Sequence, residues 1–420
     1  MNPYYAFEKT AGFLEEFIKQ KEPADKFLYK MYRQYTYWGK RDRTLIAELF
    51  YGALRHKILL QTQLHAVHLE NTLLHQVYAY TLLIYRYHMG PQLFSTNILP
   101  QENTQRWRTL ENLPMPTQWS LRYSMPDLFI DSLERVFGDH AESLAKSLTL
   151  KAPVDLRVNT LKASQENMLQ VLLNQLPDHA PQRTPWSPVG IRLNNRLSRE
   201  VLASLQGKIE IQDEGSQLAA LLCPVKPKQW VLDYCAGAGG KSLVFANQMQ
   251  NTGQLFLTDT HSRRLDKAKK RLKNAGVHNA QTLLVNEIPV RYQGAMDVVV
   301  VDAPCSGTGT WRRNPDLKYR WTSKDDLAEI QDLQHRLLSQ ASFYVKNKGF
   351  LVYIICSLLP EENQDQVQRF LEENTSFTLI SPATLYPNHP LYSTLHPYFL
   401  VTPNQHHTDG FFAALLQQHS

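Results

Sequence analysis

The sequence predicts an α/β protein: a doubly wound parallel sheet in its second half, preceded by a small α+β region and an all-helical N-terminal region. Three observations support this fold. Apolar residues up to position 150 recur at helical spacing, with little alternation of β-branched residues. Residues 152–224 contain short strand-like segments around a helix. From Lys226 onward, apolar strands alternate with helical segments, which is typical of a parallel sheet.

Composition excludes several classes of protein. The chain has 420 residues with 45 basic and 39 acidic side chains, a net charge of +6 that permits a polyanionic partner without requiring one. The start, MNPYYAFEKT, lacks the features of a secretory signal, and no apolar run reaches membrane-spanning length. The four cysteines form no Cys-x-x-Cys pair, so we expect neither a zinc site nor another metal site. We expect a cytoplasmic monomer without a membrane partner.

The N-terminal region is expected to be helical through residues 41–64, where apolar side chains share one face of a helix. The basic residues on its other face are Arg41, Arg43, Arg55 and Lys57. They are either solvated or in contact with nucleic acid. A polar, proline-rich stretch, 98–119, is interpreted as a connector, and a further helical segment runs from Pro126 to Leu148.

The middle region combines two strand-like segments, VDLRVNTL (154–161) and GKIEIQDE (207–214), with a helix from Gln165 to Leu176. The strands expected after it are 230–233, 255–258, 282–285, 297–301 and 350–355. A basic helix from His261 to Asn274 is either a solvated surface or a nucleic-acid contact. A later amphipathic helix over 327–341 is expected to stop at Gly349.

The stretch VLDYCAGAGGKS, Val231 to Ser242, contains a glycine-rich turn after the first of these strands. A P-loop would need glycine where Cys235 stands, and Asp233 would repel a triphosphate. Asp259 ends the next strand, where a carboxylate can accept both hydroxyls of a ribose. Ser242 replaces the third glycine of a dinucleotide site. The pattern therefore favours S-adenosyl-L-methionine as the cofactor.

Two cysteines follow buried strands at the same edge of the sheet, Cys305 in VVVVDAPCSGTG and Cys356 in LVYIICSLLPEEN. Carbon 5 of cytosine becomes nucleophilic only after a thiolate adds to carbon 6, and a second thiol can assist the later release. Asp302 would stabilise the protonated base. The pattern predicts formation of 5-methylcytosine, and it leaves open which thiol attacks.

Several motifs resemble those of the Sun/Nop family of RNA cytosine-5 methyltransferases, most closely the bacterial RsmB type. CAGAGGK (235–241) is similar to the family's Cys-Ala-Ala-Pro-Gly-Gly-Lys loop, and DAPCS (302–306), ICS and PEEN (355–363) are similar to its two cysteine motifs. LRVNTLK (156–162), IQDEGSQ (211–217) and DGFFAALL (409–416) match flanking segments. RDRTLIAELFYGALR is similar to a NusB-like helical domain.

The resemblance implies a class I methyltransferase, Rossmann-like fold over residues 226–420, an RRM-like α+β subdomain over 151–225, a connector and helix over 111–150, and a NusB-like RNA-binding domain over 1–110. It implies that Cys356 is the nucleophile and that Cys305 serves product release. The residues implied to bind the cofactor are Cys235, Ala236, Gly237, Ala238, Gly239, Gly240, Lys241, Asp259, Asp302 and either Asn286 or Glu287, of which we take Glu287.

Three positions depart from the family pattern: Ala238 stands for proline, Ile355 for threonine, and His261 for an acid. The stretch TWRRNPDLKYRW (310–321) mixes aromatic residues with Arg312, Arg313, Lys318 and Arg320. It is either a single-stranded RNA channel or a loop that packs its tryptophans inward. The expected substrate is 16S ribosomal RNA, with transfer RNA possible, so the chain would serve rRNA processing. The alternatives are an inactive RNA-binding or ribosome-assembly protein, an amino-group methyltransferase and an ATPase.

Overall fold

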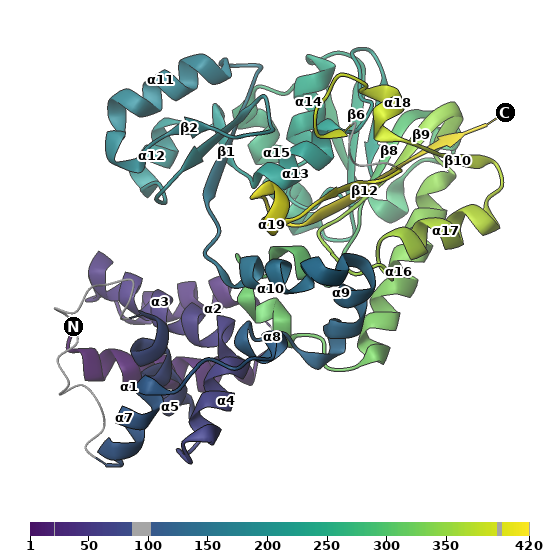
Figure 1. Ribbon diagram of the computed structural model, residues 1–420. Helices are drawn as coiled ribbons and strands as arrows, with labels where there is room; N and C mark the ends of the chain where they lie inside the picture. Colours follow the sequence, from purple (N-terminus) through teal and green to yellow (C-terminus); the bar gives the residue numbers. More distant parts are fainter. Residues whose placement is uncertain (21, 86–101, 393–396, 420) are drawn as a thin grey trace. The chain divides into compact units, whose positions relative to one another are not determined.

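The computed structural model describes residues 1–20, 22–85, 102–392 and 397–419 (Figure 1). The chain forms two compact units. One comprises Met1–Leu150 together with Trp311–Thr322, and the other comprises Lys151–Thr310 with Ser323–Ser420. Within the described ranges, none of the helices combines the length and the apolar character that a bilayer crossing requires.

The first unit is helical. Its helices are α1 (Pro3–Ile18), α2 (Ala24–Gln34), α3 (Lys40–Arg55), α4 (Lys57–Ala66), α5 (Leu73–Tyr80), the π-turn η1 (Thr81–Tyr85), α7 (Thr104–Asn112), α8 (Trp119–Arg122), α9 (Ile130–Phe137) and α10 (Ala141–Thr149). Asn2 caps α1 with its side chain, and Pro3 occupies the first helical position. Gly52 lets α3 approach α5, because a Cβ there would lie 2.0 Å from the Tyr80 ring.

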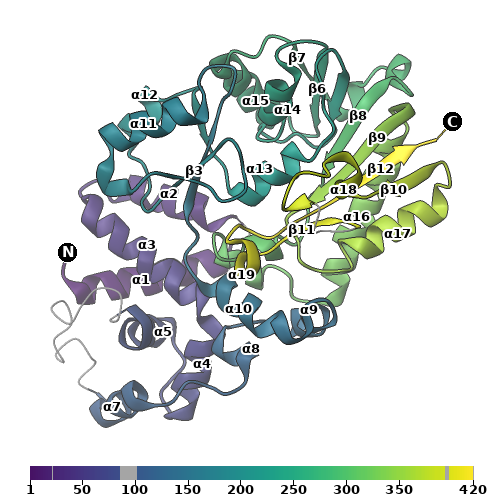
Figure 2. The same ribbon diagram turned by 45° about the horizontal axis from the view of Figure 1, so that its top comes forward.

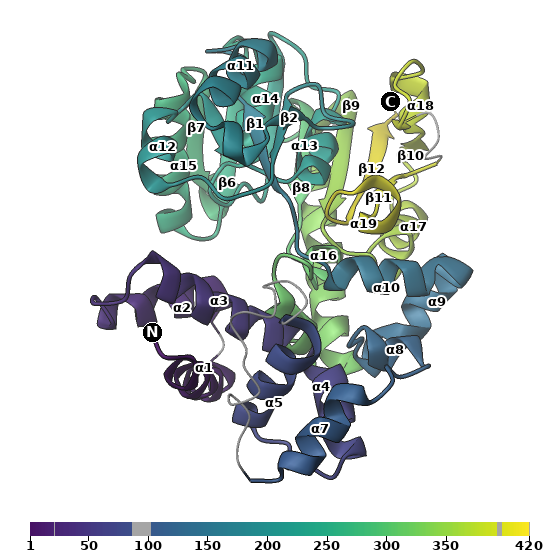
Figure 3. The same ribbon diagram turned by 60° about the vertical axis from the view of Figure 1, so that its left-hand side comes forward.

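Three expectations for this unit need correction. The helix expected over 41–64 is two helices, α3 and α4, which meet at His56. The expected connector contains α7, which lies beside α5 (Figure 3). Its Trp107 is buried against the rings of His75 and Tyr78 of α5. Residues 98–101 lie outside the described part. Gly138, with φ +48°, separates α9 from α10 within the helix expected from Pro126 to Leu148.

The second unit begins with a four-stranded antiparallel sheet of order β2-β3-β1-β4. Its elements are β1 (Val154–Val158), α11 (Gln165–Gln175), β2 (Gln182–Arg183), β3 (Gly190–Leu193), α12 (Arg199–Ser204) and β4 (Ile209–Ile211). The sequence predicted β1, α11 and β4 but not β2 or β3. The side chains of Asn159 and Lys162 donate hydrogen bonds to the carbonyls of Ala275 and Asn274, which join this sheet to the rest of the unit.

The larger sheet has the order β10-β12-β9-β8-β5-β6-β7, with β11 paired to β12 (Figure 2). Its strands are β5 (Trp230–Asp233), β6 (Gln254–Asp259), β7 (Ala280–Leu284), β8 (Met296–Asp302), β9 (Val345–Ile355), β10 (Phe377–Ile380), β11 (Phe399–Val401) and β12 (Phe411–Gln418). The five strands expected from the sequence are parallel. However, β12 runs antiparallel to β9, and β10 and β11 antiparallel to β12, so the sheet is mixed.

Helices cover both faces of this sheet: α13 (Glu214–Leu221), α14 (Ser242–Met249) and α15 (Ser262–Ala275) on one, and α16 (Lys324–Ser342) and α17 (Gln364–Glu373) on the other. Alternate residues of β8 divide between two cores, with Val298 and Val300 in one and Val299 and Val301 in the other. This explains the continuous apolar run of that strand. Helix α16 ends at Ser342; Gly349 lies inside β9, where a Cβ would meet the carbonyls of Met296 and Asp297.

The strand order reverses between β5 and β8. Asp233 of β5 pairs with Leu257 of β6 on one side and with Val300 of β8 on the other. Asp302 at the end of β8 pairs with Ile354 of β9. The segments that follow β5, β6, β8 and β9 therefore leave the same edge of the sheet, which is where open α/β sheets bind their ligands.

Candidate active site

The turn from Cys235 to Lys241 connects β5 to α14. Gly237 and Gly239 adopt left-handed backbone conformations, with φ of +55° and +77°. A Cβ on Gly239 would lie 3.1 Å from Cβ of Ala268 on α15, whereas a Cβ on Gly237 or Gly240 would meet no atom within 4 Å. Gly239 thus allows close packing on α15, and the other two glycines border open space that a ligand can fill.

A hollow of about 300 Å³ lies over this turn. Seven of the predicted residues line it: Cys235, Ala236, Gly237, Ala238, Gly240, Lys241 and Asp302. Four further residues complete the lining, and the sequence did not single them out for this role: Ile211, Gln212, Ser216 and Arg271. Burial raises the pKa of the Cys235 thiol, so this cysteine stays neutral beside the hollow.

Lys241 and Asp302 form an ion pair at the base of this hollow, with 2.6 Å between Nζ and Oδ2. Burial alone would lower the pKa of Lys241, but the Asp302 carboxylate and its hydrogen bond outweigh burial, so the pKa is raised. Cys356 also contributes to raising the pKa of Lys241. Cys356 therefore lies within electrostatic range of Lys241.

Asp233, at the end of β5, is buried beneath the turn. The Ser242 hydroxyl donates a 2.5 Å hydrogen bond to its Oδ2 atom. Burial raises the pKa of Asp233 to about 7, although the bond from Ser242 opposes that shift. Asp233 therefore supports the turn from below and does not line the hollow.

Asp259 and Glu287 lie beyond the residues that line the hollow. Asp259 ends β6, and its Oδ1 accepts a 2.8 Å hydrogen bond from the His261 main-chain N–H. Glu287 is exposed, and its Oε2 accepts a 3.2 Å bond from the Leu284 N–H, so it closes its own turn. Asn286 is also exposed. Asp259 thus has a fixed orientation at the carboxyl edge, whereas nothing in the geometry favours Glu287 over Asn286.

The two cysteines meet. The Sγ atoms of Cys305, after β8, and Cys356, after β9, lie 3.3 Å apart. The hydrogen bond to Cys356, burial, and the nearby negative charges of Cys356 and Glu362 raise the pKa of Cys305. Ile355, which stands where the family has threonine, is fully buried in the core between the sheet and α16. Both thiols can therefore reach one small ring, and Cys305 holds its proton.

The basic segment after Cys305 differs from the open RNA channel that we considered. Trp311 is fully buried against the Phe129 ring, and Arg312 is also buried. Lys318 is fully buried, and its ammonium lies 3.3–3.4 Å from the carbonyls of Arg55, Tyr123 and Ser124. Lys318 and Arg312 thus belong to the core of the helical unit and cannot contact RNA in this arrangement.

The other cations that we considered for RNA contact, on the helix over 41–64 and in the segment 310–321, differ in their exposure. Arg320 is exposed and Arg313 is half-buried. Arg55, which we had placed on a polar helix face, donates through Nη2 to the carbonyl of Arg312, and burial lowers its pKa. Only the more exposed cations remain candidates for RNA contact.

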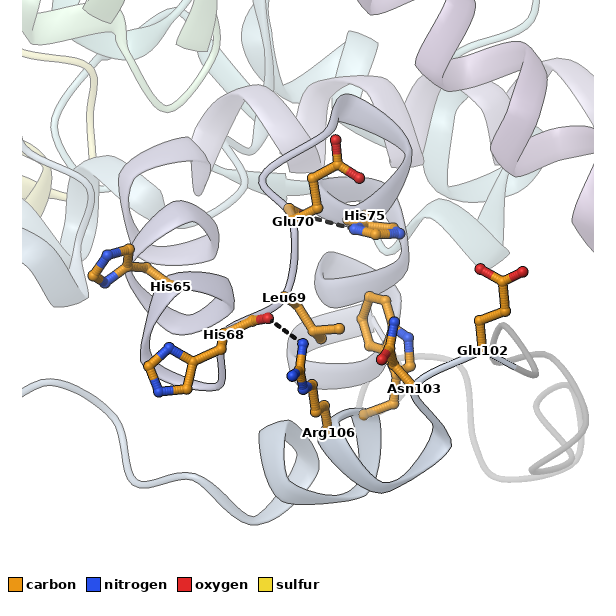
Figure 4. A pocket seen from close by; sticks show the side chains of 9 residues that line it. His65, His68, Leu69, Glu70, His75, Glu102, Asn103 and Arg106 are labelled. Atoms are coloured by element: carbon orange, nitrogen blue, oxygen red, sulfur yellow. Dashed lines mark hydrogen bonds between the residues drawn. The ribbon is translucent and has the colours of Figure 1, made fainter.

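A second hollow, of about 490 Å³, lies in the helical unit (Figure 4). His75 Nδ1 lies 2.6 Å from the Glu70 carbonyl, and Arg106 donates a 2.7 Å bond to the His68 carbonyl. Glu70, Glu102 and Arg106 all line this hollow. Among the described residues, its lining holds no cysteine, serine or threonine.

Sequence reasoning gave no role to two residues that the structure places at the site. Arg271 was one cation among many on the basic helix, and only its contacts distinguish it. Glu362 stands in the PEEN motif, and it is fully buried behind both cysteines. The signal that could have identified Glu362 was its place in the PEEN motif, which resembles a motif of the family.

Comparisons with known proteins point to one family. The family described as 16S rRNA methyltransferase RsmB/F matches residues 219–417, and its ferredoxin-like domain matches residues 125–200. A probable ribosomal RNA small subunit methyltransferase B of Synechocystis sp. is 30% identical over 308 residues, 71% of this chain and 67% of that protein. Its counterpart in Coxiella burnetii is 31% identical over 301 residues, 70% and 68% of the two chains.

Solved structures show the same fold. The protein PH0851 superposes with a TM-score of 0.76 at 22% identity over 100% of this chain and 99% of its own. A methyltransferase homolog from Pyrococcus horikoshii has a TM-score of 0.59 at 28% identity, covering 71% of this chain and 97% of its own. The predicted fold and resemblance are confirmed: the chain belongs to the RsmB/F family of S-adenosylmethionine-dependent methyltransferases.

Proposed function

We propose that this methyltransferase modifies carbon 5 of a cytosine in 16S ribosomal RNA through a covalent bond to Cys356. The observation that carries the proposal is the 3.3 Å separation of the Cys305 and Cys356 sulfurs, with Cys356 within electrostatic range of Lys241. The relatives are named as methyltransferases of the small-subunit ribosomal RNA, which supports that substrate. Transfer RNA remains a second possible substrate.

The residues around the turn fit S-adenosylmethionine, which supplies a methyl group on a sulfonium when bound. The open space over Gly237 and Gly240 accommodates its chain, and Asp259 can accept the ribose hydroxyls. Lys241 can bind a carboxylate, and Asp302 adds negative charge to a site that receives a cation. These residues would bind and orient the donor.

Cys356 is the better nucleophile of the two thiols. The raised pKa of Cys305 keeps that thiol protonated, whereas Cys356 lies within electrostatic range of the Lys241 ammonium. The Cys356 thiolate forms a bond to carbon 6 of cytosine while the C5–C6 π electrons move toward carbon 5. Asp302 stabilises the proton on the ring nitrogen.

S-adenosylmethionine, held by the turn and by Asp259, would supply the methyl group that carbon 5 receives. The proton on carbon 5 leaves to a water molecule, its electron pair restores the C5–C6 double bond, and the Cys356 thiolate departs. Because Cys305 lies within 3.3 Å of the attacking sulfur, it can assist this elimination. Blocking elimination should leave the RNA attached to the protein.

The test uses the full-length chain, S-adenosylmethionine and transcribed 16S ribosomal RNA, with transfer RNA in parallel. Cys356→Ala should abolish formation of 5-methylcytosine and give no covalent species. Cys305→Ala should accumulate a protein–RNA adduct on a denaturing gel. Cys223→Ala is the matched control, because Cys223 is a fully buried thiol with its Sγ 3.7 Å from the Ala219 carbonyl.

Methylation by Cys356→Ala at the wild-type rate would overturn the covalent route. An adduct in Cys356→Ala and none in Cys305→Ala would reverse the two roles. Modification of transfer RNA alone would move the substrate while leaving the chemistry intact.

A further inference from the structure

One buried carboxylate connects the two loops that carry the cysteines. Glu362 lies between β9 and α17 and has no exposed surface. Its Oε2 atom accepts a 2.8 Å hydrogen bond from the main-chain N–H of Ser306, the residue after Cys305. Its Oε1 atom accepts a 2.7 Å bond from the hydroxyl of Ser357, the residue after Cys356. A single side chain thus bonds the immediate neighbours of both thiols.

Further contacts make this connection rigid. Gln334 of α16 donates 2.8 Å to Glu362 Oε2 and 2.9 Å to the carbonyl of Pro304, the residue before Cys305. The hydroxyls of Ser306 and Thr308 each lie 3.1 Å from the Ser357 hydroxyl. Glu362 therefore stands at the centre of a network in which both loops are bonded to one another and to α16.

The donors around Glu362 suit an ionised carboxylate. Burial raises the pKa of Glu362, but the bonds from Ser306, Ser357 and Gln334 oppose that shift. A carboxylate only accepts hydrogen bonds, and here its two oxygens accept three. In Glu362→Gln, an amide nitrogen in place of Oε2 would face the N–H donors of Ser306 and Gln334. An amide nitrogen in place of Oε1 would leave the Ser357 hydroxyl without its acceptor.

We propose that Glu362 is a positioning residue that holds the Cys305 and Cys356 loops at the separation that thiol addition and elimination need. The proposal rests on the proposed cysteine chemistry for its purpose, but its geometry can be tested without RNA. Glu362 does not touch the substrate. It acts by fixing Ser306 and Ser357, and its charge adds to the effects that keep Cys305 protonated.

Disulfide formation between the two cysteines measures their separation directly. Diamide accepts the two electrons and two protons that the thiols lose when the S–S bond forms. In the wild-type full-length chain, a Cys305–Cys356 disulfide should form rapidly, because the sulfurs are already in contact. Glu362→Gln should slow it about tenfold or more, since misplacement by about 1 Å has effects of that order. Peptide mass spectrometry quantifies the product.

Two variants separate positioning from general destabilisation. Glu372→Gln makes the same chemical change at an exposed carboxylate of α17 and should leave the disulfide rate unchanged. Ser357→Ala keeps Glu362 but removes the hydroxyl that contacts Glu362, Ser306 and Thr308, and it should also slow the disulfide. If Glu362→Gln fails to fold, Ser357→Ala alone decides the matter.

Enzymatic readouts complete the test. Glu362→Gln should lower kcat for methylation about a hundredfold and leave KM for S-adenosylmethionine near the wild-type value. In a Cys356→Ala background, it should also shift alkylation of Cys305 by iodoacetamide to lower pH, because a negative charge has been removed. Equal disulfide rates in wild type, Glu362→Gln and Ser357→Ala would overturn the positioning role. Methylation by Cys356→Ala would instead overturn the proposed function and leave this geometry standing.

Discussion

The guanidinium of Arg271 donates a 2.6 Å hydrogen bond to the carbonyl of Ala238, in the middle of the cofactor turn. Its other terminal nitrogen donates 2.9 Å to Glu210 of β4, so Arg271 fixes the turn to the small antiparallel sheet. Because Ala238 replaces the family's proline, the turn lacks a ring that would limit its backbone. The hydrogen bond from Arg271 supplies this restraint.

Arg271→Ala should therefore weaken binding of S-adenosylmethionine. A hydrogen bond to a charged group contributes about 1.5–3 kcal/mol, so we expect Kd to rise about tenfold or more in calorimetric titration. Lys270→Ala removes an exposed cation from the same helix and serves as the control. Equal effects of the two substitutions would mean that only the overall charge of α15 matters.

Asp233 should make stability fall as pH rises. Its pKa is about 7 in the folded chain against an ordinary value of 3.8, so between these pH values the folded state holds a proton that the unfolded state has lost. Stability is then lost as pH rises from about 4 to about 7. A pKa difference of about three, at about 1.4 kcal/mol each, amounts to about 4 kcal/mol.

Asp233→Asn removes this dependence. The unfolding free energies of Asp233→Asn and the wild type can be measured with urea at several pH values. The value for the variant relative to that for the wild type should increase steadily from pH 4 to 7. The control Asp266→Asn changes an exposed carboxylate on α15. A constant difference between Asp233→Asn and the wild type across this range would show that Asp233 is not the responsible group.

Gly52→Ala should destabilise the helical unit despite the better helix propensity of alanine. The new Cβ would lie 2.0 Å from the Tyr80 ring, and overpacking of a core costs about 1–3 kcal/mol. Gly12→Ala, in α1, meets no atom within 4 Å and should stabilise by up to about 1 kcal/mol. Thermal unfolding of the two variants should thus shift in opposite directions; a shift in the same direction would argue against the close approach of α3 and α5.

Lys318→Met should lower stability without changing the salt dependence of RNA binding. Burial and the charge of Arg55 lower the pKa of Lys318, and its Nζ atom lies within hydrogen-bond distance of three carbonyls. Methionine would leave these carbonyls without that donor. Lys26→Met, at an exposed position of α2, is the control for stability. If Lys318 bound a phosphate, the slope of affinity against salt would decrease by about one, which filter binding would detect.

The sequence was most informative where apolar runs are continuous and bounded. Strand β5 has the predicted limits, Trp230–Asp233, because a buried parallel strand leaves an uninterrupted apolar signal. The direction of β12 could not be predicted, since hydropathy is the same for either orientation. Strand β3, Gly190–Leu193, was missed because Gly190 and Arg192 interrupt its apolar residues, so it lacks the continuous apolar run of β5.

Residues of the site were predictable when their own type carried the chemistry. The two thiols and the glycine turn are of this kind. Glu362 and Lys318 were not, because their roles depend on partners far away in the sequence: Ser306 and Gln334 for the first, Arg55 and Tyr123 for the second. A buried cation also resembles an exposed one in sequence until the carbonyls that satisfy it are known.

The membership of Trp311–Thr322 in the helical unit has a practical result for dissecting the protein. The polypeptide passes between the two units after residues 150, 310 and 322, so no single cut separates them. A fragment starting at Lys151 would retain the Trp311 indole and the Lys318 amine after losing Phe129, Arg55 and Tyr123, and it should aggregate. A catalytic fragment that folds on its own needs the segment Trp311–Thr322 replaced by a short hydrophilic linker.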